Sequence, residues 1–160
     1  MIKQLVELME KERELFEELG RSLHRQREAM MVRNLDDMQD ALKETEKVVL
    51  EIEKVDRERH ELFKALKRKK GLDEDAPFEK LLSTLQNEER EAFMDCTTRF
   101  LWTLNELAED LQGIKDMLEF ENSYFEFLMG MLRGGEKRST YSKQGYVQSK
   151  TEEGIFDARW

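Results

Sequence analysis

The chain has little of what builds a disulfide framework, a sheet protein or a membrane span. Its 160 residues include one Cys, one Pro and eight Gly. The single cysteine, Cys96, excludes an internal disulfide bond and fits a reducing compartment. No run of about 18 uncharged apolar residues occurs, so we expect no membrane-spanning helix. An acid at Glu7 comes too early for a signal peptide, and we therefore expect a cytoplasmic protein.

Acidic residues outnumber basic ones. The 36 Asp and Glu residues exceed the 27 Lys and Arg residues, which leaves a net charge of −9. This balance argues against nucleic acid as a partner, because phosphates would be repelled. The length predicts one domain, and the scarcity of proline among many Leu, Glu, Lys and Arg residues favours long helices.

Apolar residues recur at helical spacing in three long segments. A repeat of seven predicts a helix over about 2–32, with a seam formed by Ile2, Met9, Phe16, Leu23 and Met30. Leu5 and Leu19 fill half of the intervening seam positions, and the polar residues Glu12 and Gln26 fill the other half. Asn34, followed by two Asp residues, predicts the N-cap of a second helix over 35–69. We expect its seam at Leu35, Met38, Leu42, Thr45, Val49, Ile52, Asp56, Arg59, Phe63 and Leu66.

The second helix is expected to end in a solvated basic run, Lys64–Lys70, before Gly71. A short helix is predicted over about 77–85, starting at Pro77, and a third long helix over about 88–132. The fold class is therefore all-α: an elongated, coiled-coil-like antiparallel three-helix bundle over residues 1–133.

Residues 134–160 show no helical period and predict a flexible tail. Arg133 to Trp160 carry a net charge of +2, whereas Met1 to Leu132 carry −11. The tail also contains spaced apolar residues: Tyr141, Tyr146, Val147, Ile155, Phe156 and Trp160.

The patterns of catalysis are absent. Each of the two histidines has an arginine three residues before it, Arg21 or Arg57, so the Glu-x-x-His signature of di-iron bundles is missing. Cys96 has no basic neighbour at i±4 and is expected in the core. We expect no enzyme, no catalytic or metal site and no cofactor. A metal-binding or catalytic helical bundle is the alternative that the sequence favours least.

The end of the third helix is apolar almost all round. A bundle helix needs only one buried stripe, so a second surface must cover the others. That surface is a second copy, the tail folded back, or the helix of a partner, and the sequence leaves these open. The residues are Met117, Leu118, Phe120, Tyr124, Phe125, Phe127, Leu128, Met129, Met131 and Leu132.

Several motifs occur in a recognisable order. Glu12, Leu15, Phe16 and Leu19 form an E-x-x-L-(aromatic)-x-x-L pattern, and a hairpin follows from Glu28-Ala29 to Met38. Further matches are Glu46, Leu50–Glu53, Arg57, Asn122 with Phe125 and Leu128, Tyr141, Gly145 and Ile155-Phe156-Asp157. This set resembles the FlgN family of flagellar export chaperones. It departs from the family at Asn34, where glycine is common.

The resemblance implies a chaperone that binds the terminal helices of the hook–filament junction proteins FlgK and FlgL, prevents their premature assembly and delivers them to the export gate. For such a chaperone we expect the end of the third helix to form the wall of the cargo site and the tail to supply apolar anchors, with gate docking through either Phe120 or Tyr124, between which the sequence does not select. The chaperone would be a monomer or a weak homodimer. The alternative is a non-enzymatic coiled-coil adaptor that forms a homo-oligomer. The expected cargo-binding residues are Leu118, Phe125, Leu128, Met129 and Leu132 in the wall and Tyr141, Val147, Ile155 and Phe156 in the tail.

Overall fold

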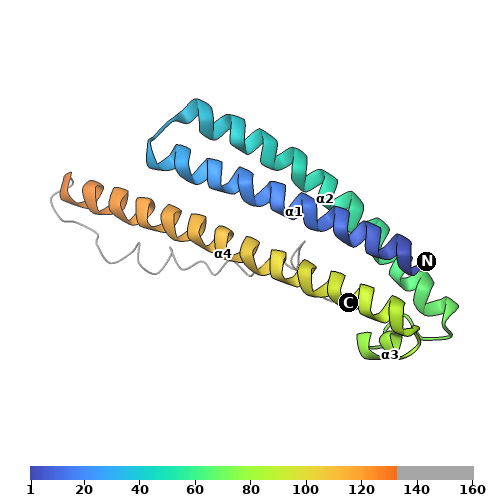
Figure 1. The fold of residues 1–160 in the computed structure, drawn as a ribbon. Helices are drawn as coiled ribbons and strands as arrows, with labels where there is room; N and C mark the ends of the chain where they lie inside the picture. The colour runs from blue at the N-terminus through green and yellow to red at the C-terminus, as the bar shows by residue number, and fades with distance from the viewer. Residues whose placement is uncertain (133–160) are drawn as a thin grey trace.

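A computed structural model describes residues 1–132 of the chain as four helices. They are α1 (Ile2–Met31), α2 (Leu35–Lys69), α3 (Phe78–Ser83) and α4 (Asn87–Leu132), and no strand occurs among these residues. The predicted all-α, elongated fold is confirmed (Figure 1). The predicted tail over 134–160 lies outside the described residues, so the division into bundle and tail stays a prediction.

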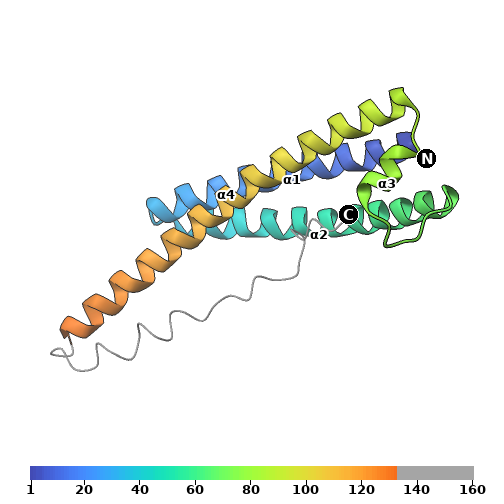
Figure 2. The ribbon, with the colours of Figure 1, turned by 90° about the horizontal axis from the view of Figure 1, so that it is seen from below.

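The helices run up, down and up. α1 and α2 form an antiparallel hairpin, and α4 lies along α1 in the same direction (Figures 1 and 2). Phe16 of α1 meets Phe100 of α4 edge to face, with ring centroids 5.6 Å apart. The short helix α3 covers the end of the bundle where the chain begins, and its Leu81 is fully buried there.

The α1–α2 turn follows from local chemistry. Arg33 adopts a positive φ of 56°, and Asn34 then caps α2 by accepting a hydrogen bond from the backbone N–H of Asp37 at 3.2 Å. Asp36 and Asp37 lie in the first turn of α2, where the helix dipole favours negative charge. The predicted cap is therefore confirmed.

The predicted seam of α1 is confirmed along its whole length. Six seam residues, from Ile2 to Leu23, belong to one continuous core, and Met30 near the turn is buried as well. The buried seam residues of α1 are Ile2, Leu5, Met9, Phe16, Leu19, Leu23 and Met30.

The predicted seam of α2 is wrong at Leu35 and Leu42, whereas Val49 packs against the core and Thr45 accepts a hydrogen bond from Gln26 of α1. Leu35 and Leu42 are 70% and 50% exposed, and Ala41 and Val48 are buried in their place. The reason is a close approach of the two helices near the turn. Ser22 donates a hydrogen bond to the backbone oxygen of Ala41 at 3.0 Å, which leaves room only for small side chains between the backbones.

The basic run at the end of α2 is only partly solvated. The prediction of a fully solvated run is therefore wrong at Lys67. Lys67 is 2% exposed, lies 4.6 Å from the centroid of the Phe63 ring, and donates a hydrogen bond to the backbone oxygen of Glu74 at 2.9 Å. It ties the loop after α2 to the bundle, whereas Arg68, Lys69 and Lys70 are exposed.

Two polar breaks in the predicted seams form a pair in the core. The Nε atom of Arg59 donates to a carboxylate oxygen of Glu12 at 2.6 Å, and the same guanidinium donates to Asp56 at 2.7 Å. The Arg59 guanidinium also lies 5.4 Å from the centroid of the Phe100 ring on α4. Burial raises the pKa of Glu12 to about 7, against the opposing effect of Arg59. Three helices therefore meet at one buried ion pair.

Candidate functional site

The C-terminal part of α4 extends beyond the hairpin. The Nε2 atom of His24 lies 3.0 Å from a carboxylate oxygen of Asp110, and the Arg27 guanidinium lies against Gly113. His24 and Asp110 are 110 − 24 = 86 positions apart in the sequence, and the same offset places Met31, the last residue of α1, level with Met117. Residues 118–132 have no such neighbour on α1, and both views show this part of α4 beyond the α1–α2 turn (Figures 1 and 2). We call residues 118–132 the projecting segment; it is about 22 Å long.

Large apolar side chains of the projecting segment are exposed to solvent. Their exposed fractions range from 39% for Leu128 to 81% for Leu132. Exposed apolar patches of this kind are typical of interaction surfaces, which makes the projecting segment the candidate site. The exposed set is Leu118, Phe120, Phe127, Leu128, Met131 and Leu132.

Helical spacing sorts these residues into two stripes. The seam stripe, residues 118, 125, 128, 129 and 132, continues the face of α4 on which Leu107, Leu111 and Ile114 pack in the bundle. The outer stripe, residues 120, 124, 127 and 131, lies about 120° away around the helix axis. One stripe is thus the core seam of the bundle, extended past the end of α1.

The predicted wall residues and the predicted docking residues fall on different stripes. Leu118, Leu128 and Leu132 are exposed on the seam stripe, and Met129 is half-buried there. Phe120 is exposed on the outer stripe. Phe125 and Tyr124 belong to α4, and their side chains lie outside the described set. The predicted tail anchors Tyr141, Val147, Ile155 and Phe156 also lie outside the described residues.

The turn of the hairpin carries a surface that the sequence analysis missed. Met31, Val32 and Leu35 are all largely exposed there, level with the start of the projecting segment. Turns are ordinarily polar, so apolar residues directly around the capping pattern at Asn34 were the available signal. These side chains enlarge the apolar surface at this end of the molecule.

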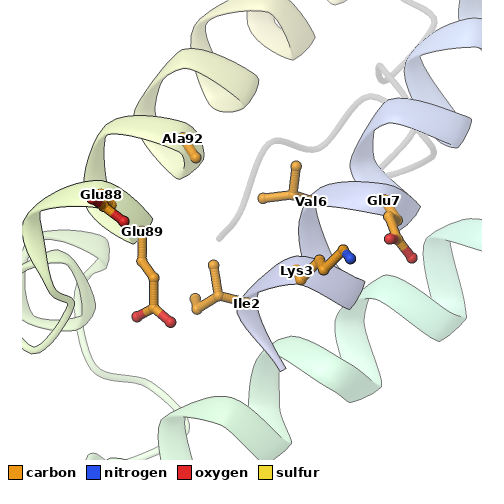
Figure 3. A pocket seen from close by; sticks show the side chains of 7 residues that line it. All are labelled: Ile2, Lys3, Val6, Glu7, Glu88, Glu89 and Ala92. Atoms are coloured by element: carbon orange, nitrogen blue, oxygen red, sulfur yellow. The ribbon is translucent and has the colours of Figure 1, made fainter.

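A groove of about 440 Å³ lies at the other end of the bundle, between the starts of α1 and α4. Ile2, Val6 and Ala92 point into the space between the two helices (Figure 3). Charged residues line the remainder: Lys3, Glu7, Glu88 and Glu89. These four are exposed, and no buried acid or base lies among the lining residues.

The described residues contain no candidate metal centre. No group of three or more His, Cys, Asp or Glu residues in this part of the chain could hold a metal ion. Cys96 is buried in the core, as expected, and burial raises the pKa of its thiol. Within residues 1–132 we find no helix that is long and apolar enough to cross a membrane.

These features define an elongated helical protein with an exposed apolar helix end, a class whose surfaces suit the binding of other helices. The chain matches the family model described as FlgN protein over residues 1–149 and belongs to that family. FlgN is the family of flagellar export chaperones, so a general role in flagellum assembly follows. No curated protein and no solved structure matches the chain.

Proposed function

We propose that this chain is a cytoplasmic chaperone, without catalytic activity, for the terminal helices of the junction proteins FlgK and FlgL. It binds their amphipathic helices, prevents premature assembly and delivers them to the export gate. The observation that carries the proposal is the seam stripe, a continuation of a core face that α1 no longer covers within residues 1–132.

The position of the seam stripe suggests how a cargo helix would bind. α1 covers the equivalent face of α4 up to about residue 117 and then ends. A cargo helix that extends the line of α1 would bury its own apolar stripe against Leu118, Leu128 and Leu132. Such a helix would meet the same spacing of apolar side chains that α1 meets in the bundle.

The separation of the stripes supports a second part of the proposal. Phe120 is exposed on the outer stripe, away from the face assigned to cargo. An export-gate component could therefore contact Phe120 or Tyr124 while cargo stays on the seam stripe. Phe120→Ser should reduce export of the junction proteins by cells and leave cargo affinity unchanged. Reduced cargo affinity in this variant would argue against separate surfaces.

Paired substitutions in the full chain test the cargo site. Leu128 and Leu101 are both leucines of α4, 39% and 41% exposed, and only Leu128 lies in the projecting segment. We expect Leu128→Ser to weaken binding of a FlgK terminal peptide about tenfold, since it removes roughly 1.4 kcal/mol of apolar burial. Leu101→Ser should leave the affinity unchanged. Equal effects of the two variants would contradict the proposed site.

We expect cargo to be held between the seam stripe and the tail over residues 134–160, which together form a clamp. The double variant Tyr141→Ser with Phe156→Ser should weaken binding of the same FlgK peptide, because the tail anchors close over the cargo. A homo-oligomeric adaptor predicts a different pattern. Its oligomeric state would depend on the exposed stripes, and it would not bind the peptide. Sedimentation of the full chain with and without peptide distinguishes the two functions.

A further inference from the structure

The projecting segment combines exposed apolar side chains with one sign of charge. The projecting segment contains three carboxylates, Asp116 lies two residues before it, and residues 116–132 contain no Lys or Arg. Glu119 and Glu126 are seven residues apart and so lie along one side of the helix, between the two stripes. A segment that covers this surface should therefore be both apolar and basic. The four acidic residues are Asp116, Glu119, Glu121 and Glu126.

The chain itself contains such a segment directly after α4. Residues 137–150 contain four basic residues and no acidic residue, so their charge of +4 matches the −4 of residues 116–132. Apolar side chains stand between the cations, at Tyr141, Tyr146 and Val147. The basic residues are Lys137, Arg138, Lys143 and Lys150.

Chain length and connection allow the two segments to meet. Gly134-Gly135 stand between the end of α4 and the basic segment, and glycine permits a sharp reversal of the chain. Seven extended residues span about 23 Å, slightly more than the length of the projecting segment. The 14 residues from 137 to 150 are thus more than enough to run back along it. A tether this short gives an effective concentration of about a millimolar.

We propose that residues 137–150 fold back onto the projecting segment of the same molecule in the absence of cargo and compete there with an incoming helix. The regulatory role rests on the proposed function, but the contact itself does not. Cargo must displace this contact, so the free chaperone protects its apolar helix end while the apolar tail residues remain available to cover bound cargo.

Hydrogen exchange in the full chain tests the contact. The tail variant carries Lys137→Glu, Arg138→Glu, Lys143→Glu and Lys150→Glu. We expect amides 118–132 to exchange about tenfold faster in this variant than in the natural chain, because repulsion replaces attraction. Raising the salt concentration to about 0.5 M should speed exchange of the natural chain in the same region.

A control variant makes the same change of net charge elsewhere. It carries Glu at four exposed positions of α1 and α2, and it should leave exchange of amides 118–132 unchanged. The control positions are Lys11, Lys43, Lys47 and Lys54.

Two results would overturn the inference. One is equal exchange of amides 118–132 in the natural chain and the tail variant. The other is protection that increases with protein concentration, because a second copy would then be the occupant. Peptide binding separates this inference from the proposed function. Binding of the FlgK peptide without an exchange difference would refute only the fold-back contact. An exchange difference without binding of the FlgK peptide would refute only the cargo role.

Discussion

The buried Glu12 carboxyl should make the stability of the protein fall as the pH rises. Glu12 is 1% exposed, and burial raises its pKa from 4.5 to about 7. The folded state therefore holds a proton between these two values that the unfolded state has lost. The stabilisation is complete below pH 4.5 and is lost as the pH rises through 7. A shift of this size corresponds to about 3 kcal/mol in total, of which about 2 kcal/mol falls between about pH 5.5 and pH 8.

Glu12→Gln isolates this effect, because the amide has a similar shape and does not titrate. Urea unfolding of the natural chain and the variant should be compared at several values between about pH 5.5 and pH 8. We expect the natural chain to lose about 2 kcal/mol relative to the variant across this range. A constant difference, or one that increases with pH, would show that Arg59 keeps Glu12 ionised and would refute the reasoning. Glu10→Gln is the control of opposite sign, since the hydrogen bond from Arg13 lowers the pKa of Glu10 and its contribution is lost only in acid.

Three further tests concern the packing. Arg59→Ala should destabilise the protein by about 3 kcal/mol or more near pH 8, because it leaves Glu12 without its guanidinium partner. The double variant Glu12→Leu with Arg59→Met should recover most of this loss of stability. Unfolding curves in which the losses of the two positions add up would contradict this prediction. Ala41→Leu should lower the unfolding free energy by about 1–3 kcal/mol, because the larger side chain overpacks the close contact with α1. Leu42→Ala should change the unfolding free energy by less than about 0.5 kcal/mol. Equal losses of stability in the two variants would favour Leu42 as the core residue, as the sequence predicted. Lys67→Met should remove the hydrogen bond to the loop and speed hydrogen exchange of residues 70–76, and unchanged exchange would show that Lys67 does not hold the loop.

Local chemistry allowed much of the helical frame to be predicted. The cap at Asn34 depends on a side chain and a backbone group three residues apart, and the sequence contains both. The seam of α1 is a repeat of seven with apolar residues on one face, which predicts its buried side directly.

The errors arose where a contact outside the helix itself determines which side chain is buried. The exposure of Leu42 and the burial of Ala41 depend on the approach of Ser22, 19 positions before Ala41. The burial of Lys67 depends on a carbonyl group in the following loop. Periodicity ranks a leucine above an alanine as a core residue, and it contains no information on the distance between two helices.

The candidate site was predictable in outline. The sequence showed that the end of the third helix has more apolar residues than one seam can bury. The structure added the reason they are exposed: α1 has 30 residues and α4 has 46, and their register leaves the last part of α4 without α1. The exposed residues at the hairpin turn were missed because Met31 and Val32 were not part of the predicted seam and Leu35 was assigned to the buried seam of α2.

The most direct test of the central claim is to find where a cargo helix lies. A photo-crosslinking amino acid placed at position 128 or at position 101 of the full chain would be exposed to a FlgK terminal helix. We expect position 128 to crosslink to the cargo helix and position 101 to remain free of it, since only the first lies on the seam stripe beyond α1. Crosslinks from position 101 without crosslinks from position 128 would contradict the proposed binding surface.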